Sequence, residues 1–225
     1  MAVKRAMDVC GALLGLVLFS PLLALAALAL RLTQGSPVLF RQLRPGWHGQ
    51  AFTILKLRTM RSLREGETLY ESDAARVTPL GRFLRATSID ELPELWNVLR
   101  GDMSLVGPRP LLEEYLSEYS PDERRRHDMR PGITGWAAVN GRNAIPFRER
   151  LALDVWYVDH HNLLLDLKIL ALTAYQVLRR ENAKVTESIE ELGFPLPIGE
   201  ARSAAAASQA GERKTPPRGE GPKGG

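Results

Sequence analysis

The sequence has few of the residues and motifs on which several common types of functional site depend. Only one of its 225 residues is cysteine, Cys10, which excludes an internal disulfide and a metal site built from cysteines. Neither a glycine-rich phosphate-binding loop nor a Gly-x-Ser-x-Gly motif occurs. The four histidines, at positions 48, 127, 160 and 161, do not have the spacing of zinc ligands. Zinc-dependent hydrolysis is therefore disfavoured.

The two ends of the chain are depleted in opposite kinds of residue. Residues 9–30 carry no charge, and residues 201–225 have no apolar side chain larger than alanine apart from proline. The C-terminal segment holds five basic and two acidic residues, which is +3 of the total net charge of +4. The high isoelectric point therefore does not indicate a nucleic-acid partner, and we expect none. We expect residues 201–225 to form a disordered tail.

The uncharged run is long enough to cross a lipid bilayer. It holds nine leucines in 22 residues. A straight helix of that length extends about 33 Å, against about 30 Å for the hydrocarbon core. A cleaved signal peptide fits poorly, because the run is too long and no cleavage site follows it in a polar stretch. A helix that spans the membrane is a second interpretation.

Two features favour a helix that enters and leaves the membrane on the same side. Ser20-Pro21 lies in the middle of the run, where proline removes a backbone hydrogen bond and bends a helix. Basic residues, which prefer the cytoplasm, flank the run on both sides: Lys4, Arg5, Arg31, Arg41 and Arg44. We therefore predict a re-entrant membrane helix over residues 1–32, broken at Ser20-Pro21.

The rest of the sequence predicts mostly helices with a small β element, an α+β fold in one membrane-associated domain. Residues 35–50 are rich in Gly, Pro and Arg and indicate a connector. Residues 51–60 alternate like a strand, with Lys56 and Arg58 on one face. Residues 78–85 predict an amphipathic helix, which would lie either at the membrane interface or on the protein's own core. Further helices are expected over 88–100, 111–119, 147–161 and 163–180, and a strand or hairpin over 133–139.

The acidic pair Asp90-Glu91 is the best candidate for a catalytic or metal-binding group in the sequence. The pattern from Ser88 to Glu91 matches a capping box, so it predicts that Asp90 lies at the start of a helix. A helix N-terminus lowers the pKa of a carboxylate and attracts phosphate. Such a carboxylate can attack phosphorus, or it can hold Mg²⁺ beside the phosphates of a substrate. Taken alone, the pair is more often only a helix cap.

Five stretches carry more information together than any one motif. They are Ser20-Pro21, FTILKLRTM (52–60), TSIDELPELWNVLRGDMSLVGPRP (87–110), RPGITGWAAVNGRN (130–143) and LDVWYVDHHNLLLDLKILALT (153–173). In order and spacing they resemble the bacterial sugar transferases, which are monotopic polyprenol-phosphate phosphoglycosyl transferases. The resemblance covers roughly residues 1–190. The compact size most resembles the small subgroup that starts bacillosamine-type glycan assembly.

The resemblance implies an Mg²⁺-dependent enzyme that moves a phosphosugar from a UDP-sugar to undecaprenyl phosphate and releases UMP. It makes Asp90 the nucleophile that carries the phosphosugar covalently, and also the residue nearest Mg²⁺. Glu91 would be its partner, and Arg109 would bind phosphate. The other basic residues that fall in matching motifs are candidate substrate-binding residues: Lys56, Arg58, Arg85 and Arg142.

The resemblance also implies a location and partners. Residues 33–200 would form the catalytic region on the cytoplasmic face of a bacterial inner membrane, with membrane lipid and downstream glycosyltransferases as partners. Ala138 stands where the family commonly has glutamine, so the sugar preference is open; N-acetylated hexosamines come first, then galactose or glucose. Two other functions stay open: a phosphatase of polyprenyl or nucleotide diphosphates, and a catalytically silent membrane scaffold.

Overall fold

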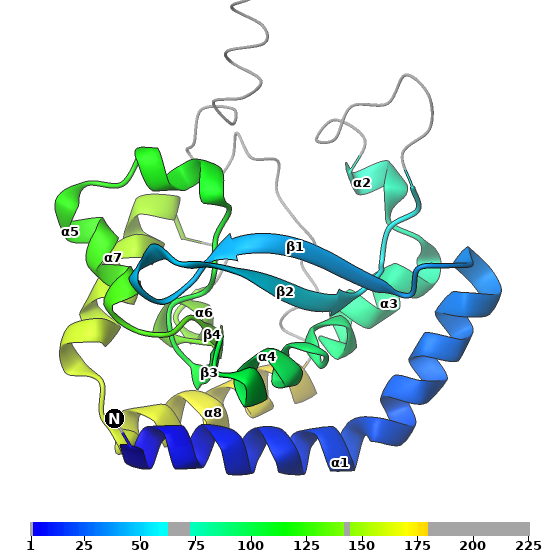
Figure 1. Cartoon of the computed structure of the whole chain (residues 1–225), viewed down its shortest axis with the longest axis horizontal. Helices are drawn as coiled ribbons and strands as arrows, with labels where there is room; N and C mark the ends of the chain where they lie inside the picture. The colour runs from blue at the N-terminus through cyan, green and yellow to red at the C-terminus, as the bar shows by residue number, and fades with distance from the viewer. Residues whose placement is uncertain (1, 63–72, 142–144, 180–225) are drawn as a thin grey trace, which may run out of the picture.

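The computed structural model describes residues 2–62, 73–141 and 145–179. A long helix, α1 (Ala2–Gln34), runs along one edge of the molecule and rises at one end (Figure 1). The chain then crosses the molecule as an antiparallel hairpin of β1 (Leu39–Pro45) and β2 (Ala51–Leu57). The other elements follow in this order: α2 (Asp73–Arg76), α3 (Pro79–Ala86), α4 (Glu94–Arg100), β3 (Ser104–Val106), α5 (Pro121–Arg124), β4 (Gly132–Thr134), α6 (Trp136–Val139), α7 (Phe147–His160) and α8 (Leu163–Leu178). The expectation of a mostly helical fold with a small β element is confirmed, and the predicted tail lies outside the described residues.

Helix α1 bends near its middle without being interrupted (Figure 1). Pro21 lies inside the helix and has no N–H to donate to the carbonyl of Val17. The hydroxyl of Ser20 donates to that carbonyl instead, at 2.8 Å. The break expected at Ser20-Pro21 is therefore corrected to a bend, because serine replaces the hydrogen bond that proline removes.

Polar contacts fasten the first turns of α1 to the rest of the protein. The ammonium of Lys4 donates to the carboxylate of Asp166 on α8 at 2.7 Å. The guanidinium of Arg5 donates to two carbonyls in the last turn of α4, at 2.6 and 2.9 Å. The carboxylate of Asp8 is buried and accepts from the hydroxyl of Ser104 at 2.9 Å. The N-terminal end of this apolar helix is therefore bound through charged groups to the folded body.

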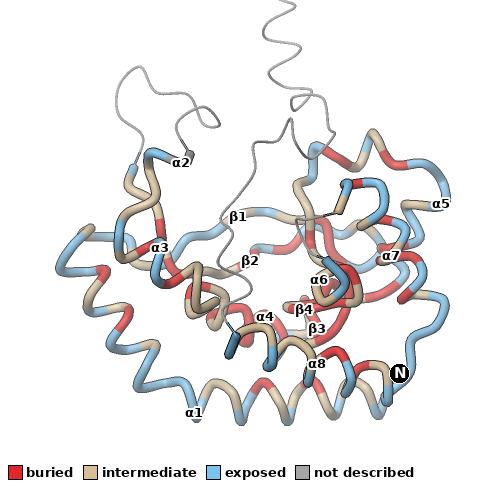
Figure 2. Tube along the Cα trace, turned by 180° about the vertical axis from the view of Figure 1, so that it is seen from behind, coloured by how far each residue is buried: buried red, intermediate tan, exposed pale blue. Residues whose placement is uncertain are grey.

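The C-terminal end of α1 is fastened to the same body. The guanidinium of Arg58, just after β2, donates to the carbonyls of Gln34, Gly35 and Ser36 at 2.5, 3.0 and 3.3 Å. Between its two ends, α1 keeps much of its surface exposed (Figure 2). Large apolar side chains make up much of that exposed surface: Leu13, Leu14, Val17, Leu18, Leu22, Leu25, Leu28 and Leu32. It is the one described helix that is long and apolar enough to cross a membrane.

The β1–β2 hairpin corrects the expectation of a connector over residues 35–50. Leu39 pairs with Leu57 at one end of the ladder, and Pro45 pairs with Ala51 at the turn. The glycines and prolines that suggested a connector lie before β1 and in the hairpin turn, and β1 is mostly exposed, so no alternation of apolar and polar residues marks it. The strand predicted over residues 51–60 is confirmed, but it ends at Leu57.

Helix α4 is attached to the hairpin by one buried side chain. The side-chain oxygen of Asn97 accepts from the N–H of Leu55 at 3.0 Å, and its amide donates to the carbonyl of Thr53 at 2.7 Å. Asn97 therefore satisfies backbone groups of β2 that a further strand would otherwise bind. Phe52 and Ile54 of β2 pack with the first half of α1 and with α4, in the same apolar cluster. This packing fixes the position of the residues at the start of α4 relative to β2.

The junction between α3 and α4 differs from the predicted capping box. The helix predicted over residues 78–85 is present as α3, and Thr78 caps it, its hydroxyl accepting from the N–H of Gly81 at 3.0 Å. Ser88, however, adopts a left-handed conformation with φ of 55° and makes no side-chain cap. Its N–H donates to the carbonyl of Arg85, so it ends α3 rather than starting α4. Asp90 lies in a single 3-10 turn, Ile89–Glu91, and α4 begins only at Glu94.

Candidate active site

Glu91 is the centre of a charged cluster that three segments build. Its Oε1 accepts from the ammonium of Lys56 at 2.8 Å and from the guanidinium of Arg109 at 2.5 Å. Lys56 comes from β2, and Arg109 comes from the loop after β3. Burial alone would raise the pKa of Glu91, but the charges of Arg109 and Lys56 hold it well below its usual range. Glu91 is therefore an ionised carboxylate engaged by two cations.

Asp90 is buried beside Glu91, yet its carboxylate has no hydrogen-bond or ion-pair partner among the residues that the structure describes. Burial raises the pKa of Asp90, and the charge of Glu91 raises it further. The charges of Lys56, Arg85 and Arg109 act in the opposite direction. Asp90 is thus a carboxylate with unoccupied oxygens in surroundings that contain three cations.

Glu94 belongs to the same cluster, although the sequence analysis did not select it. Its side chain is 2 % exposed and lies 3.1 Å from the ammonium of Lys56. Burial raises the pKa of Glu94 to about 7, and the nearby charge of Glu91 adds to this effect although Lys56 opposes it. The available signal was the spacing of three residues from Glu91, which places two acidic side chains on one side of a helical turn.

The loop that carries Arg109 is held against β4 by backbone hydrogen bonds. The N–H of Gly107 donates to the carbonyl of Thr134 at 2.9 Å, and the N–H of Gly132 donates to the carbonyl of Pro108 at 3.0 Å. The charge of Glu91 raises the pKa of Arg109, so its guanidinium stays fully ionised. The loop therefore presents a permanent cation beside Asp90 and Glu91.

Arg44 of β1 is a second residue of the site that the sequence did not single out, and it is basic. Its guanidinium donates to the side chain of Gln42 at 2.6 Å. Burial, followed by the charge of Arg109, lowers the pKa of Arg44 to about 10. Two arginines that repel one another in this way form a suitable place for an anion. Recognising β1 as a strand would have put Arg44 on the hairpin opposite Phe52, on the same face as Lys56 but four residues further along the ladder.

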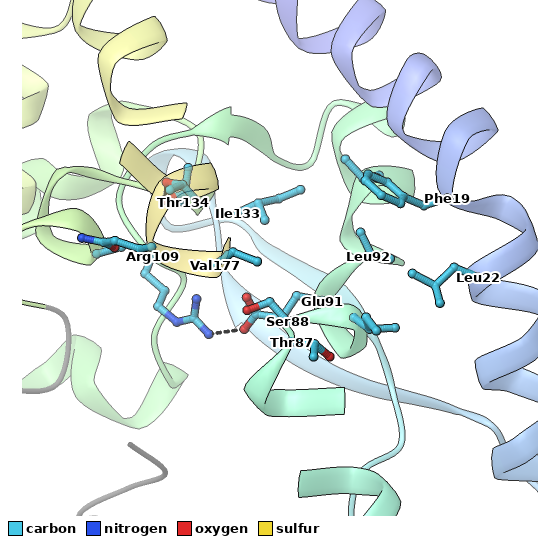
Figure 3. Close-up of a pocket in the computed structure, with 15 residues that line it drawn as sticks. Phe19, Leu22, Thr87, Ser88, Glu91, Leu92, Arg109, Ile133, Thr134 and Val177 are labelled. Atoms are coloured by element: carbon cyan, nitrogen blue, oxygen red, sulfur yellow. Dashed lines mark hydrogen bonds and ion pairs between the residues drawn. The ribbon is translucent and has the colours of Figure 1, made fainter. Parts of the chain in front are cut away.

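A cavity of about 410 Å³ opens beside the cluster (Figure 3). Glu91 and Arg109 line it, and Figure 3 shows Phe19 and Leu22 of α1 across from them. Many of the other lining residues are apolar and come from the turn before α4 and from α4, β4, α6 and α8: Leu92, Leu95, Ile133, Ala138 and Val177. The cavity thus has a charged part at Glu91 and Arg109 and an apolar part that extends to the bend of the long helix.

The other predicted site residues are distributed around this cavity or lie apart from it. Arg85 is close enough to Asp90 to influence its pKa, and its Nε donates to the hydroxyl of Thr59 at 2.9 Å. Arg58 does not join the Glu91 cluster in the described part of the chain; it binds the carbonyls at the end of α1 instead. The strand ends at Leu57, so the period of two that grouped Arg58 with Lys56 does not extend to it. Arg142 lies outside the described residues.

The comparison with known proteins now identifies the family. The profile described as "Bacterial sugar transferase" matches residues 1–180 of the chain. The chain belongs to the bacterial sugar transferase family. This sugar transferase is 49 % identical over 189 residues to "Uncharacterized sugar transferase EpsL" of Bacillus subtilis (strain 168), a match that covers 84 % of the chain and 94 % of that relative.

Two further relatives have names that state an activity. This sugar transferase is 47 % identical over 190 residues to "UDP-glucose:undecaprenyl-phosphate glucose-1-phosphate transferase" of Caulobacter vibrioides, covering 80 % of the chain and 71 % of the relative. It is 38 % identical over 199 residues to "Undecaprenyl-phosphate galactose phosphotransferase" of Salmonella typhimurium, covering 80 % of the chain but only 42 % of that longer relative. The family predicted from the sequence is confirmed. The bacillosamine subgroup is corrected, because the relatives' names give glucose and galactose instead.

The residues of this sugar transferase fit one type of metal site and not another. Within residues 2–62, 73–141 and 145–179, no group of three or more His, Cys, Asp or Glu side chains could enclose a metal ion. Mg²⁺, however, commonly uses only one or two protein carboxylates and takes its remaining ligands from water and substrate phosphates. Asp90, with oxygens that no described residue binds, fits this requirement. The donor set therefore suits Mg²⁺ that arrives together with a diphosphate.

Proposed function

We propose that this chain transfers a hexose 1-phosphate from a UDP-hexose to undecaprenyl phosphate, and so starts the assembly of a bacterial polysaccharide. The observation that carries the proposal is the contrast between two adjacent carboxylates. Lys56 and Arg109 engage Glu91, while Asp90 has no partner among the described residues. A carboxylate needs unoccupied oxygens to attack phosphorus, so Asp90 is the nucleophile and Glu91 holds the cations in place.

The reaction proceeds in two displacements at phosphorus. In the first, an oxygen of Asp90 forms a bond to the sugar-bearing β-phosphorus, and the bond from that phosphorus to the bridging oxygen breaks, so UMP leaves with the electron pair. In the second, a phosphate oxygen of undecaprenyl phosphate attacks the same phosphorus. The bond to Asp90 then breaks, the carboxylate is regenerated, and undecaprenyl diphosphate hexose forms. No oxidant or reductant is needed.

The charges around Asp90 support this chemistry. A diphosphate donor and an anionic nucleophile repel one another, so the site has to offset several negative charges. Arg109 and Lys56 already neutralise Glu91, Arg85 adds positive charge close to Asp90, and Arg44 adds positive charge near Arg109 and Glu94. Arginine suits phosphate oxygens because its planar guanidinium can donate two parallel hydrogen bonds. Mg²⁺, when bound by Asp90 and the diphosphate, would supply additional charge neutralisation.

The lipid acceptor accounts for the apolar part of the cavity. Its walls include Phe19 and Leu22 on α1, and Val177 on α8. Undecaprenyl phosphate cannot leave the membrane, whereas a UDP-hexose is soluble in water. A cavity that joins the exposed apolar helix to Glu91 and Arg109 would bring the lipid phosphate to these two residues, next to Asp90 in the chain, while the lipid chain stays among apolar side chains. The cations beside the charged part of the cavity, Arg109 and Lys56, would then attract the two phosphates of a UDP-sugar.

We further propose that α1 is re-entrant, on the cytoplasmic face of the inner membrane. Lys4, Arg5 and Asp8 fasten one end of the helix to the body, and Arg58 fastens the other. A straight helix that spanned the bilayer would put these two ends on opposite sides of it. The bend at Pro21 lets both ends stay with one body while the exposed leucines between them enter the lipid. The basic flanks favour the cytoplasmic side.

The donor is proposed to be a UDP-hexose, with UDP-glucose and UDP-galactose as the first candidates. The names of two relatives support this choice, one giving UDP-glucose as donor and the other giving galactose as the transferred sugar. It replaces the expectation of an N-acetylated hexosamine.

The experiment that tests the proposal measures the first half of the reaction without lipid. The purified full chain is incubated with Mg²⁺ and UDP-[¹⁴C]hexose, and the labelled hexose 1-phosphate that acid releases from the enzyme is measured. In a parallel incubation with unlabelled UDP-hexose, the incorporation of labelled UMP into the donor is followed. A covalent intermediate predicts exchange in the absence of undecaprenyl phosphate, and a phosphohexose adduct in the intact mass. Asp90→Asn should abolish both, whereas Asp122→Asn, at an exposed aspartate on α5, should leave both unchanged. Full lipid-dependent product from Asp90→Asn at a near-normal rate would refute the role of Asp90, and direct displacement in a ternary complex would replace it.

A further inference from the structure

A buried ion pair lies directly behind Arg109, outside the cluster of Asp90 and Glu91. Arg126 and Asp154 are both almost fully buried, with side chains 1 % and 5 % exposed. The Nη2 atom of Arg126 lies 2.6 Å from Oδ2 of Asp154, and its Nε lies 3.2 Å from the same oxygen. Asp154 comes from α7, while Arg126 comes from the 3-10 turn after α5. Neither residue belongs to the chemistry described above.

The same nitrogen of Arg126 binds the backbone of the loop that carries Arg109. Nη2 of Arg126 donates to the main-chain carbonyl of Arg109 at 2.6 Å. This carbonyl is the backbone group adjacent to the Cα from which the Arg109 side chain extends. Asp154 accepts from Nη2 and Nε of the same guanidinium, and the hydroxyl of Tyr119 lies 3.5 Å from Nη1. One buried guanidinium therefore connects α7 to the backbone of Arg109.

The backbone around Arg109 depends on this contact because its sequence removes the usual donors. Arg109 lies between Pro108 and Pro110, neither of which has an N–H. The carbonyl of Pro108 is fixed by the N–H of Gly132 at 3.0 Å. The carbonyl of Arg109 is fixed by the side chain of Arg126. Together the two contacts set the peptide planes on both sides of the Arg109 Cα, and with them the direction of its side chain.

We propose that Arg126, held by Asp154, is a positioning residue that aims Arg109 at the phosphates of the substrate. This inference rests on the proposed function, in which Arg109 binds phosphate beside Asp90. A buried ion pair is weak support for stability, because apolar residues of similar volume often replace one without loss. The pair can supply something that an apolar pair cannot, which is a donor for the Arg109 carbonyl. Displacement of a binding group by about 1 Å can lower a rate about 100-fold.

The test removes both charges at once, so that no unpaired charge stays in the interior. Arg126→Met/Asp154→Leu should fold, with a melting temperature within about 5 °C of the unsubstituted chain. Its kcat/KM for lipid-dependent UMP release from a UDP-hexose should fall about tenfold or more. Unchanged kcat/KM in the folded double variant would overturn the proposal.

A second arm asks whether the effect acts through Arg109. The same pair of substitutions is placed in an Arg109→Ala background, and the residual rate is measured with radiolabelled donor. If Arg126 acts by aiming Arg109, the pair should now lower the rate less than about twofold, since the side chain that it aims is absent. A further loss of tenfold in that background would show a general structural effect and would overturn the proposal. The unsubstituted chain serves as a separate check, because absence of lipid-dependent UMP release there contradicts the proposed function itself.

Two single substitutions complete the design and apply even if the double variant fails to fold. Asp154→Asn keeps an oxygen that accepts from Arg126, so Arg126 should still bind the Arg109 carbonyl. We expect a lower melting temperature but kcat/KM within about threefold. Tyr119→Phe removes only the 3.5 Å neighbour of Arg126 and should leave kcat/KM unchanged. A tenfold loss of kcat/KM in folded Asp154→Asn would contradict the proposal, since the contact to Arg109 is retained there.

Discussion

The guanidinium of Arg58 donates a hydrogen bond of 2.5 Å to the main-chain carbonyl of Gln34, the last residue of α1. Arg58 follows β2, and Phe52 and Ile54 within β2 pack against the first half of the same helix. The hairpin therefore connects the two limbs of α1 to one body. Because both ends of α1 are bound to one body, a membrane-impermeant reagent should reach both ends from the same side of the membrane.

The first prediction concerns the topology of α1. In a Cys10→Ser background, single cysteines are introduced at Ala2 and at Thr33, both exposed near the ends of the helix. Both should react with a membrane-impermeant maleimide in inverted inner-membrane vesicles, and neither should react in intact spheroplasts. Leu18→Cys, on the exposed apolar middle of the helix, should react only after detergent is added. Labelling of the two ends from opposite faces would show a helix that spans the membrane.

The second prediction concerns Lys56, which lies between Glu91 and Glu94. Lys56→Met removes the cation that both carboxylates share, so Glu94 becomes a buried acid without a counter-charge. We expect kcat/KM for UMP release to fall about 100-fold, since a preorganised charge beside the reacting phosphate is lost. The melting temperature should also fall. Arg41→Met, at an exposed cation on β1, is the matched control and should leave both quantities unchanged.

Lys56 and Arg58 also show how far the sequence alone could lead. Alternation along residues 51–60 predicts a strand, and the strand is present, with Lys56 directed to the acidic cluster. The same alternation placed Arg58 beside Lys56, but a period of two holds only while the strand continues. Because β2 ends at Leu57, Arg58 is free to turn towards α1. The local pattern predicted the strand, but tertiary contacts decided the role of Arg58, the residue that follows it.

Ser88 illustrates the other limit. A serine three residues before a glutamate predicts the start of a helix, and the same pattern can also follow the end of one. Here the N–H of Ser88 binds the carbonyl of Arg85, so the residue ends α3 in a left-handed conformation. The long helices α7 and α8 were predicted closely, because each runs for fourteen or sixteen residues without a glycine or proline to end it. Glu94 and Arg44 were missed because their importance comes from neighbours that are distant in sequence.

The third prediction tests the backbone that carries Arg109. A Cβ added at Gly107 would lie 2.4 Å from the carbonyl oxygen of Arg130 and 2.9 Å from the backbone nitrogen of Gly132. These are backbone atoms of β4 and the turn before it, so they cannot move aside as a flexible side chain can. Gly107→Ala should destabilise the fold by about 1–3 kcal/mol and displace the loop. We expect a lower melting temperature and a loss of kcat/KM of about tenfold or more.

The control for this substitution is Gly15→Ala on α1. There the added Cβ would lie 3.0 Å from the end of the Leu95 side chain, which is flexible. Alanine also has a higher helix propensity than glycine. The melting temperature of Gly15→Ala should therefore stay close to that of the unsubstituted chain. Equal behaviour of the two variants would contradict the steric argument for Gly107.

The fourth prediction concerns pH and His127. This histidine lies on the 3-10 turn after α5, and its Nδ1 lies 3.1 Å from the carbonyl oxygen of Gly46 in the hairpin turn. Its Nε2 is buried and has no hydrogen-bond partner among the described residues. Burial, followed by the charge of Arg126, lowers the pKa of His127 to about 4. The folded protein therefore holds this imidazole neutral.

The sign of the effect follows from proton linkage. Between pH 6.5 and 4 the unfolded chain binds a proton at His127 and the folded chain does not, so protonation favours unfolding as pH falls. The contribution of His127 is fully present above pH 6.5 and is lost progressively below it. From these pKa values, the contribution of His127 to the free energy of unfolding should fall by up to about 2 kcal/mol between pH 7.5 and 5. Glu94, whose pKa is raised to about 7, acts in the opposite direction over an overlapping range.

Because two groups oppose one another, the measurement has to compare variants rather than follow one chain. His127→Gln keeps a donor for the Gly46 carbonyl but does not titrate, so its stability should decline less between pH 7.5 and 5 than that of the unsubstituted chain, by about 2 kcal/mol in urea unfolding. His160→Gln, at an exposed histidine, should behave like the unsubstituted chain. Parallel curves for His127→Gln and the unsubstituted chain would mean that burial of His127 does not govern the acid side of the profile. Glu94→Gln should affect the pH dependence in the opposite sense. It should abolish the loss of stability that Glu94 causes as pH rises towards 7, so the two variants separate the two groups in one set of experiments.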